Sequence, residues 1–375
     1  MADDKLTVFS AGNGDTILIE AHGKAILTDV HYRARANDDG DDEALDFAPD
    51  LREACAGDML DVFVLTHPDK DHLGGFSDIF HVGSPAHWDD DPDDGEVKIL
   101  VDEIWCTPYG ADPNYVTDEA EPLINEIKRR KELMGNPQGN NPGNRLRILD
   151  SDTEAGEAFA PGIEWRLLAP NQDECDIPDA EDGEDPASSN PTSLVIQWTI
   201  SVSGTDHQIL LCGDTTTDVL ERLHDEVLAD TPGDLAWDVL VAPHHCSRHS
   251  IGTVEHPGKD EEFEESAKAI AVLSEQNGSG FIVSSSNRFK RNVSPPSSYA
   301  RNRYWKILAN GGEATAKDKE RFLCTGENSD GDPEHVVVYL TATGPSRARG
   351  LKAPAVAAAA ASSSTGRGGT YGDMG

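Results

Sequence analysis

Two histidines and two aspartates stand within six residues of one another in the segment V-F-V-L-T-H-P-D-K-D-H-L-G-G-F, residues 62–76. Imidazole and carboxylate groups together suit zinc, manganese or iron. One ion would not use all four groups from so short a loop comfortably, whereas two ions can share them. A polar surface loop of accidental composition is the alternative, but the apolar strand before the segment and the Gly-Gly turn after it argue against that interpretation. The candidate ligands are His67, Asp69, Asp71 and His72.

The elements around this segment must hold its side chains in place. A buried strand is expected at residues 61–66, and the end of such a strand presents side chains at the sheet edge where sites tend to form. Further strands are expected at residues 6–10, 16–20, 25–29, 99–106, 163–168, 193–200, 208–212, 237–242, 280–284 and 336–341, and helices at 43–56, 119–133, 216–228, 263–276 and 297–309. Hairpins followed by strands that alternate with helices predict an α/β fold of mixed sheets covered by helices.

The chain carries a formal net charge of −38, from 69 acidic and 31 basic residues in a length of 375. A charge of that size favours solubility and repels polyanions at long range. The excess lies largely in stretches rich in Asp, Gly and Pro, which suit solvated turns. An acid-rich proteome therefore explains the charge better than a binding surface does.

The six cysteines have no paired close spacing, which argues against both a disulfide framework and a zinc knuckle. No apolar run is long enough to span a bilayer. The acidic N-terminus, M-A-D-D-K-L, lacks an apolar signal region. We therefore expect a cytoplasmic protein with no membrane partner.

From residue 346 onward the composition changes to small residues and glycines without apolar periodicity. Such a segment cannot bury enough surface to offset its ordering entropy. We expect one folded hydrolase domain at residues 1–345 and a disordered low-complexity tail at 346–375.

The H-x-D-x-D-H pattern of residues 67–72 resembles the H-x-H-x-D-H signature of the metallo-β-lactamase superfamily, in the variant of the metallohydrolase domain of ComEC-type competence proteins. Four other segments are similar to that family in the same order: F-S-A-G-N-G-D-T-I-L-I (9–19), N-P-T-S-L-V (190–195), L-L-C-G-D (210–214) and V-L-V-A-P-H-H-C-S (239–247). The similarity covers residues 5 to about 310. It implies an αβ/βα sandwich with the metals between the two sheets.

The resemblance also implies roles for individual residues. His67 and Asp69 would bind one metal, and the other metal would be bound by Asp71 and His72. Asp214 would bridge the two ions as a carboxylate.

The paired histidines of the P-H-H segment receive different roles. His245 aligns with the last metal-binding histidine of the superfamily, and His244 becomes a substrate-facing catalytic group alongside Asp71, although the two histidines could be exchanged. Asp29, the family's first-motif aspartate, would orient a ligand histidine and would not itself bind metal.

Two departures from the family pattern change the expectation. The third-motif histidine has no clear match, and Asn190 stands near its place in a supporting position. The first metal site would therefore have more oxygen ligands, which shifts its preference from zinc toward manganese. In addition, the segment N-R-F-K-R-N-V-S-P-P (287–296) lacks the histidine-proline found in the family, which leaves protonation of the leaving group open.

The charge of the chain reverses locally after this segment begins. The basic residues between 287 and 306, with no acidic residue among them, are Arg288, Lys290, Arg291, Arg301, Arg303 and Lys306. The first three could neutralise substrate phosphates. An equally strong alternative is that the basic side chains pair with acidic loops of the same chain.

The chemistry expected from two such ions is hydrolysis by a metal-bridging hydroxide. The resemblance and the basic segment favour a phosphodiester substrate, such as DNA or a nucleotide. One alternative is hydrolysis of a thioester, lactone or amide by the same metal centre. Another is a metal-stabilised interaction module that works with a partner enzyme, its C-terminal tail acting as a tether.

Overall fold

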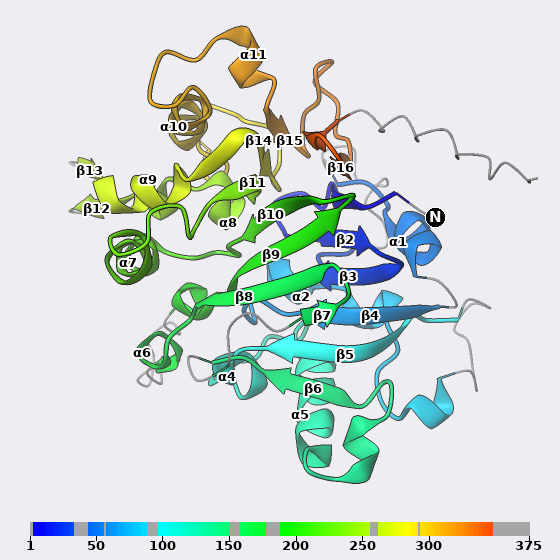
Figure 1. Cartoon of the computed structure of the whole chain (residues 1–375). Coiled ribbons are helices and arrows are strands. Elements are labelled where there is room, and N and C mark those ends of the chain that lie inside the picture. Colours follow the sequence, from blue (N-terminus) through cyan, green and yellow to red (C-terminus); the bar gives the residue numbers. More distant parts are fainter. Residues whose placement is uncertain are drawn as a thin grey trace, which may run out of the picture.

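The computed structural model of the protein describes residues 3–33, 44–55, 58–88, 97–150, 153, 158–177, 188–255, 262–291 and 293–347. Two large mixed sheets lie against each other, with helices on their outer sides (Figure 1). This arrangement confirms the predicted α/β sandwich. Among the described residues, no helix is long and apolar enough to cross a membrane.

The first sheet contains both ends of the described chain. Its spatial order is β17 (Gly344–Ser346), β16 (Val336–Thr341), β1 (Lys5–Val8), β2 (Ile17–Ala21), β3 (Lys24–Thr28), β4 (Met59–Val64), β5 (Leu100–Cys106) and β6 (Arg145–Ile148). The strands from β17 to β3 are antiparallel, and those from β3 to β6 are parallel.

The second sheet is built from the middle of the chain. Its order is β15 (Phe322–Cys324), β14 (Gln276–Ser284), β11 (Trp237–Val241), β10 (Thr205–Leu211), β9 (Val195–Val202), β8 (Ile163–Ala169) and β7 (Ala158–Ala160). Here the strands from β10 to β15 are parallel. A separate hairpin consists of β12 (Gly252–Glu255) and β13 (Glu262–Glu265).

The helices connect and cover these strands. They are α1 (Ala48–Ala54), α2 (Lys70–Leu73), α3 (Phe76–Ile79), α4 (Pro108–Ala111), α5 (Glu121–Leu133), α6 (Gln172–Cys175), α7 (Thr217–Leu223), α8 (Pro243–Cys246), α9 (Ala267–Leu273), α10 (Ser298–Leu308) and α11 (Ala316–Lys319). Single helical turns lie at Pro85–His87, Pro137–Asn140, Asn190–Thr192, His224–Leu228 and Arg248–Ser250.

Three apolar clusters define the layers. Strand β4 contributes to two of them, because Phe63 packs toward α1, α3 and α5 while Val62 and Val64 face the other sheet. Between the sheets, the ring of Trp105 in β5 stacks on that of Trp198 in β9 with centroids 5.7 Å apart. The third cluster lies between the second sheet and α7, α9 and α10. The result is a helix–sheet–sheet–helix sandwich whose sheets are buried on both faces.

A buried ion pair fixes α5 to the first sheet. Arg130 is 1% exposed, and its Nε donates to Glu126 Oε1 at 2.7 Å. Its guanidinium also donates to the carbonyl oxygens of Val101 at 2.9 Å and Arg145 at 3.0 Å. The helix is therefore attached to β5 and to the start of β6 by a single side chain.

All the predicted strands are present, most of them with shifted ends, but two predicted helices are partly wrong. Residues expected to begin the helix at 263 form strand β13, because Ser266 caps α9 by accepting a hydrogen bond from the Ala269 amide at 3.1 Å. The predicted helix also ends too late, at residue 276, because Gln276 is the first residue of β14. The predicted helix at 43–56 is helical only from Ala48, and residues 43 and 56 lie outside the described part.

The end of the folded domain also differs slightly from the expected boundary. Ser346 belongs to β17, and Arg347 donates to the Val337 carbonyl at 3.1 Å. Residues 348–375 of the predicted tail lie outside the described residues.

Candidate metal centre

The segment that follows β4 turns from extended backbone into a helix. Asp69 has extended dihedral angles at the position before α2, so His67 and Asp69 approach the site from extended chain. Asp71 and His72 follow in the first turn of α2. The change of backbone conformation therefore allows one short loop to present four polar side chains over more than one side of a centre.

Asp214 comes from the second sheet, two residues after the Cys212 that follows β10. Gly213 precedes it with a φ of +50°, and a Cβ there would lie 2.9 Å from Cβ of Thr66. The two sheets thus approach so closely at this point that only glycine fits without displacement. The close approach places Asp214 opposite the 67–72 segment.

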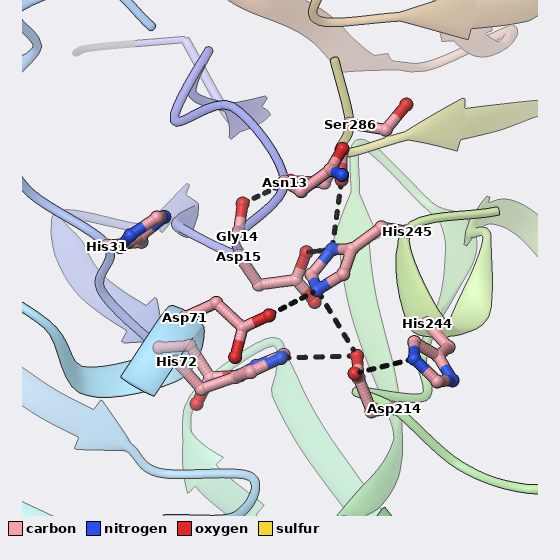
Figure 2. A network of polar contacts seen from close by, with 12 residues as sticks. Asn13, Gly14, Asp15, His31, Asp71, His72, Asp214, His244, His245 and Ser286 are labelled. Atoms are coloured by element: carbon pink, nitrogen blue, oxygen red, sulfur yellow. Dashed lines mark hydrogen bonds and ion pairs between the residues drawn. The ribbon is translucent and has the colours of Figure 1, made fainter. Parts of the chain in front are cut away.

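The paired histidines lie on an unusual turn after β11. His244, His245 and Cys246 have φ values of 50°, 49° and 62°, all in the left-handed region. Non-glycine residues in that region cost of order 1 kcal/mol or more each, and such strain concentrates at functional sites. The turn sends the two imidazoles to different sides of Asp214, with ring planes 82° apart (Figure 2).

Four ligand atoms of Asp71, His72, Asp214 and His245 lie within 4.8 Å of one another. His72 Nε2 is 3.1 Å from Asp214 Oδ1, and His245 Nε2 is 3.5 Å from the same oxygen. His245 Nε2 is also 3.3 Å from Asp71 Oδ2. Figure 2 shows these groups pointing toward one another across the gap between the sheets.

His67 and Asp69 stand beside this cluster. The His67 and His72 rings have centroids 4.1 Å apart, and His67 Nε2 is 3.5 Å from Asp69 Oδ2. The other oxygen of Asp69 accepts a hydrogen bond from the Ser189 hydroxyl. The loop that follows β4 therefore contributes both to the four-atom cluster and to a second group next to it.

Two buried carboxylates orient the histidines from behind. Asp29 Oδ2 is 2.7 Å from His72 Nδ1, and its other oxygen accepts from the Thr66 amide at 2.7 Å. Asp15 Oδ1 lies 3.4 Å from His245 Nδ1, which also contacts the Ser285 carbonyl at 3.0 Å. Partners on Nδ1 direct Nε2 of both rings into the site, the arrangement typical of histidine metal ligands.

The atoms that converge on the centre are buried but make no hydrogen bonds to the described residues. They are Nε2 of His67, His72 and His245 and Oδ1 of Asp214. A buried polar atom without a partner costs free energy, so native structures rarely leave several of them facing one another. Imidazole nitrogens and carboxylate oxygens in this arrangement fit a divalent ion of the zinc or manganese type.

The electrostatics of the cluster agree with such an ion. Burial opposes charge on Asp214, but His245 and His72 hold the pKa of its carboxyl well below the usual range. Burial likewise opposes charge on His72, and Asp214 and Asp29 nevertheless raise the pKa of its imidazole well above 6.5. The surroundings of the imidazoles are therefore strongly negative, and a divalent ion bound among these groups would compete with protons for the same nitrogens.

Two residues that the sequence analysis missed belong to the site. Asp15 contacts His245, and Ser189 contacts Asp69. Asn190, the predicted supporting residue, lies one position further on, where its amide N–H donates to the Ser188 hydroxyl and its carbonyl accepts from the Ser193 amide. The G-N-G-D turn was a signal for Asp15, whereas nothing in the sequence distinguished Ser189 from its neighbours.

The basic residues after β14 are divided between two kinds of environment. Arg301 contacts Glu327 at 3.3 Å, and Arg303 pairs with Glu265. Arg288 donates to the Gly331 carbonyl, while Lys290 and Arg291 are exposed. Pairing within the chain therefore accounts for part of the basic segment.

No family model and no curated relative matches this chain. Its structure has a distant similarity to those of three solved proteins. A possible metal-dependent hydrolase from Veillonella parvula shares 12% identity over 88% of this chain and 98% of that chain, with a TM-score of 0.38. A diphosphatase from the PhnP family shares 11% sequence identity over 90% of this chain and 98% of that chain, with a TM-score of 0.36. Metallo-β-lactamase SMB-1 shares 12% sequence identity over 73% of this chain and 90% of that chain, with a TM-score of 0.34. The roles of individual residues rest on the geometry of this chain alone.

Proposed function

We propose that this protein is a metal-dependent hydrolase with the metallo-β-lactamase fold, that it binds two divalent ions, and that it cleaves phosphodiesters. The observation that carries the proposal is the convergence on Asp214 of buried ligand atoms from both sheets that make no hydrogen bonds to the described residues. Zinc and manganese are the candidate ions. When bound, such ions make water a stronger acid and stabilise negative charge on the attacked centre.

The chain's own residues perform the remaining tasks. Asp29 and Asp15 fix the orientation of the histidines, while Asp214 lies between the two groups of ligands. The carboxylates of Asp69 and Asp71 are 43% and 38% exposed, in contrast to the buried histidines next to them. The centre is therefore open to substrate on the side of these two carboxylates.

The phosphodiester assignment is supported by the resemblance of the motifs and by the placement of the basic segment. The Asn287 amide donates to Asn13 Oδ1 at 2.8 Å, and Asn13 Nδ2 donates to the Pro295 carbonyl at 3.0 Å. These bonds attach Asn287 and Pro295 to the glycine turn that leads to Asp15. Lys290 and Arg291 are thus carried by a loop that borders the centre, where positive charge would offset repulsion of a phosphate by the acidic chain.

The test is hydrolysis of bis(p-nitrophenyl) phosphate by protein reconstituted with manganese or zinc after chelation. We expect turnover that requires metal and falls by at least about a thousandfold in Asp214→Asn, since that residue stands between both ligand groups. Asp218→Asn, an exposed aspartate in the first turn of α7, is the matched control and should retain wild-type turnover.

The alternative substrates are tested in the same preparation. A thioester, a lactone and an amide presented to the reconstituted protein should be hydrolysed far more slowly than the phosphodiester. Metal-dependent turnover of one of them without phosphodiester turnover would move the assignment to that class. Full metal occupancy with no turnover of any substrate would favour the interaction module.

A further inference from the structure

Asp214 presents its two oxygens to different partners. Oδ1 faces His72 and His245, at 3.1 and 3.5 Å, whereas Oδ2 faces His244 Nε2 at 3.4 Å. A carboxylate that bridges two ions would divide its oxygens in the same way. The imidazole at Oδ2 thus occupies the position of a ligand to the ion on that side.

The spacing of the atoms agrees with coordination. Two atoms that each lie about 2.1 Å from one tetrahedral ion are about 3.4 Å apart. His244 Nε2 and Asp214 Oδ2 are 3.4 Å apart, and His67 Nε2 and Asp69 Oδ2 are 3.5 Å apart. Both pairs are too long for good hydrogen bonds and have the separation of two ligands on one ion.

The ligand count points the same way. The four-atom cluster of Asp71, His72, His245 and Asp214 Oδ1 is sufficient for one ion. Beside that cluster lie two separate pairs of possible ligand atoms, His67 Nε2 with Asp69 Oδ2 and His244 Nε2 with Asp214 Oδ2.

We infer that His244 is the fourth protein ligand of the first ion, with His67, Asp69 and Asp214 Oδ2. This inference rests on the proposed metal centre and changes the role of His244 from a substrate-facing group to a ligand. It compensates for the third-motif histidine that this chain lacks. The left-handed turn at His244 and His245 then has a purpose, because it allows adjacent residues to ligate different ions.

The test measures metal stoichiometry after equilibrium dialysis against zinc. The variant is His244→Gly, because glycine adopts the left-handed conformation without strain and the fold should be retained. We expect wild type to hold two ions and His244→Gly to hold one, with added imidazole restoring the second. His249→Gly, at an exposed histidine on the following turn, should retain two ions.

Two results would overturn the inference: a wild-type stoichiometry of one ion, or two ions held at wild-type affinity by His244→Gly. These results are separable from failure of the proposed function. A protein that binds two ions in this pattern but cleaves no phosphodiester keeps the ligand assignment and loses only the substrate.

A second observation concerns the open side of the centre. A cavity of about 390 Å³ begins at Asp69 and Asp71 and extends between the 67–72 loop and the segments that follow β5 and precede β9. Its remaining lining residues are Pro68, Lys70, Tyr109, Tyr115, Thr117, Ser188 and Ser189. Tyr115 is 56% exposed, the highest value among the large apolar and aromatic side chains of the described residues.

The charges of this cavity are balanced locally. Lys70 contacts Glu119 at 2.5 Å, and the ions would offset Asp69 and Asp71. The surface that is left consists of tyrosine rings and hydroxyl groups. Such a surface suits an uncharged aromatic ring with polar edges better than it suits a second phosphate.

We propose that this cavity binds a nucleobase attached to the phosphate, stacked on Tyr115. The proposal rests on the proposed function and specifies its substrate class. Base–aromatic stacking is strong enough to raise affinity roughly tenfold. The probes are adenosine 5′-monophosphate and ribose 5-phosphate, which share sugar and phosphate and differ only in the base.

Calorimetric titration of the manganese-loaded protein should give roughly tenfold tighter binding of the nucleotide. Tyr115→Leu should bring the two affinities together, whereas Tyr115→Phe should preserve the difference. Tyr299→Leu, at a 49% exposed tyrosine of α10, is the control and should behave as wild type. Equal wild-type affinities, or an unchanged ratio in Tyr115→Leu, would overturn the proposal. If the protein had no phosphodiesterase activity but still bound adenosine 5′-monophosphate more tightly than ribose 5-phosphate, the assignment of the cavity as a nucleobase site would stand.

Discussion

Asp29 and His72 form a fully buried pair in which Asp29 Oδ2 lies 2.7 Å from His72 Nδ1. The same carboxylate accepts from the amide and the hydroxyl of Thr66, at 2.7 and 2.6 Å. Asp29 therefore sets both the position of the segment after β4 and the tautomer of the histidine within it. A proton on Nδ1 leaves Nε2 free to bind an ion.

Replacing Asp29 with Asn keeps an acceptor for the Thr66 amide but places a donor group against His72 Nδ1. That donor favours the tautomer with its proton on Nε2, which cannot bind metal. We expect the affinity for zinc to fall by about 10- to 100-fold, measured by competition with a chromophoric chelator. Asp238→Asn, which changes an acceptor of the Gln208 amide in the second sheet, is the control. Wild-type affinity in Asp29→Asn would show that Asp29 has only a structural role.

Asp214 and Asp69 should differ in how many ions depend on them. Asp214→Ala removes a carboxylate placed between both ligand groups, so elemental analysis should show loss of both ions and turnover should cease. Asp69→Ala removes a ligand from one group and should empty mainly that one. If the Asp214→Ala variant retained its full metal content, Asp214 would not be a metal ligand.

The residues of the basic loop differ in their exposure. Lys290 and Arg291 are exposed, so Lys290→Gln with Arg291→Gln should raise KM for a phosphodiester and flatten its salt dependence, without changing metal content. Arg288 donates to the Gly331 carbonyl, so Arg288→Gln should lower the melting temperature instead. An unchanged KM in the double variant would weaken the phosphodiester assignment and favour an uncharged substrate.

The Glu126–Arg130 pair predicts a pH-dependent stability. Burial raises the pKa of Glu126, but hydrogen bonds and charge from Arg129 and Arg130 outweigh it and leave the pKa below 4.5. A lowered folded-state pKa means that the stabilisation is complete above pH 4.5 and is lost as pH falls through the folded-state value.

Glu126→Gln leaves the Arg130 charge buried without its carboxylate and should cost about 3 kcal/mol at neutral pH. Urea denaturation at several pH values should show this difference shrinking as pH falls below about 4.5, because the unfolded chain then binds a proton at Glu126 before the folded chain does. A difference that stays constant down to pH 3 would mean that the charge of Glu126 contributes little.

The sequence was informative where local pattern decides the structure. Buried strands such as β4 are predicted correctly because both of their faces are apolar. The loop after β4 is recognisable because it contains four ionisable side chains within six residues. Edge strands were missed for the opposite reason. Strand β6 has the sequence R-L-R-I with every residue only half-buried, so it is defined by pairing with β5 and not by its own pattern.

The supporting contacts of the site could not be predicted for a different reason. Ser189 and Asp69 are 120 residues apart, and their contact depends on how the two sheets are offset. The strained turn at His244 is likewise attached to a distant segment, because the His244 amide donates to the Gly213 carbonyl at 2.9 Å, and no local sequence pattern encodes that contact.

The pairing of β16 with β1 has a consequence for biosynthesis. The Ser10 amide donates to His335 Nδ1, 325 residues further along the chain. At about 5–20 residues per second, a ribosome needs roughly 16–65 s to make the segment between them. During that time β1 emerges with an unpaired edge, which invites pairing with another nascent chain. We therefore expect newly made protein to need a chaperone, or slow and dilute synthesis, until its last strands close the first sheet.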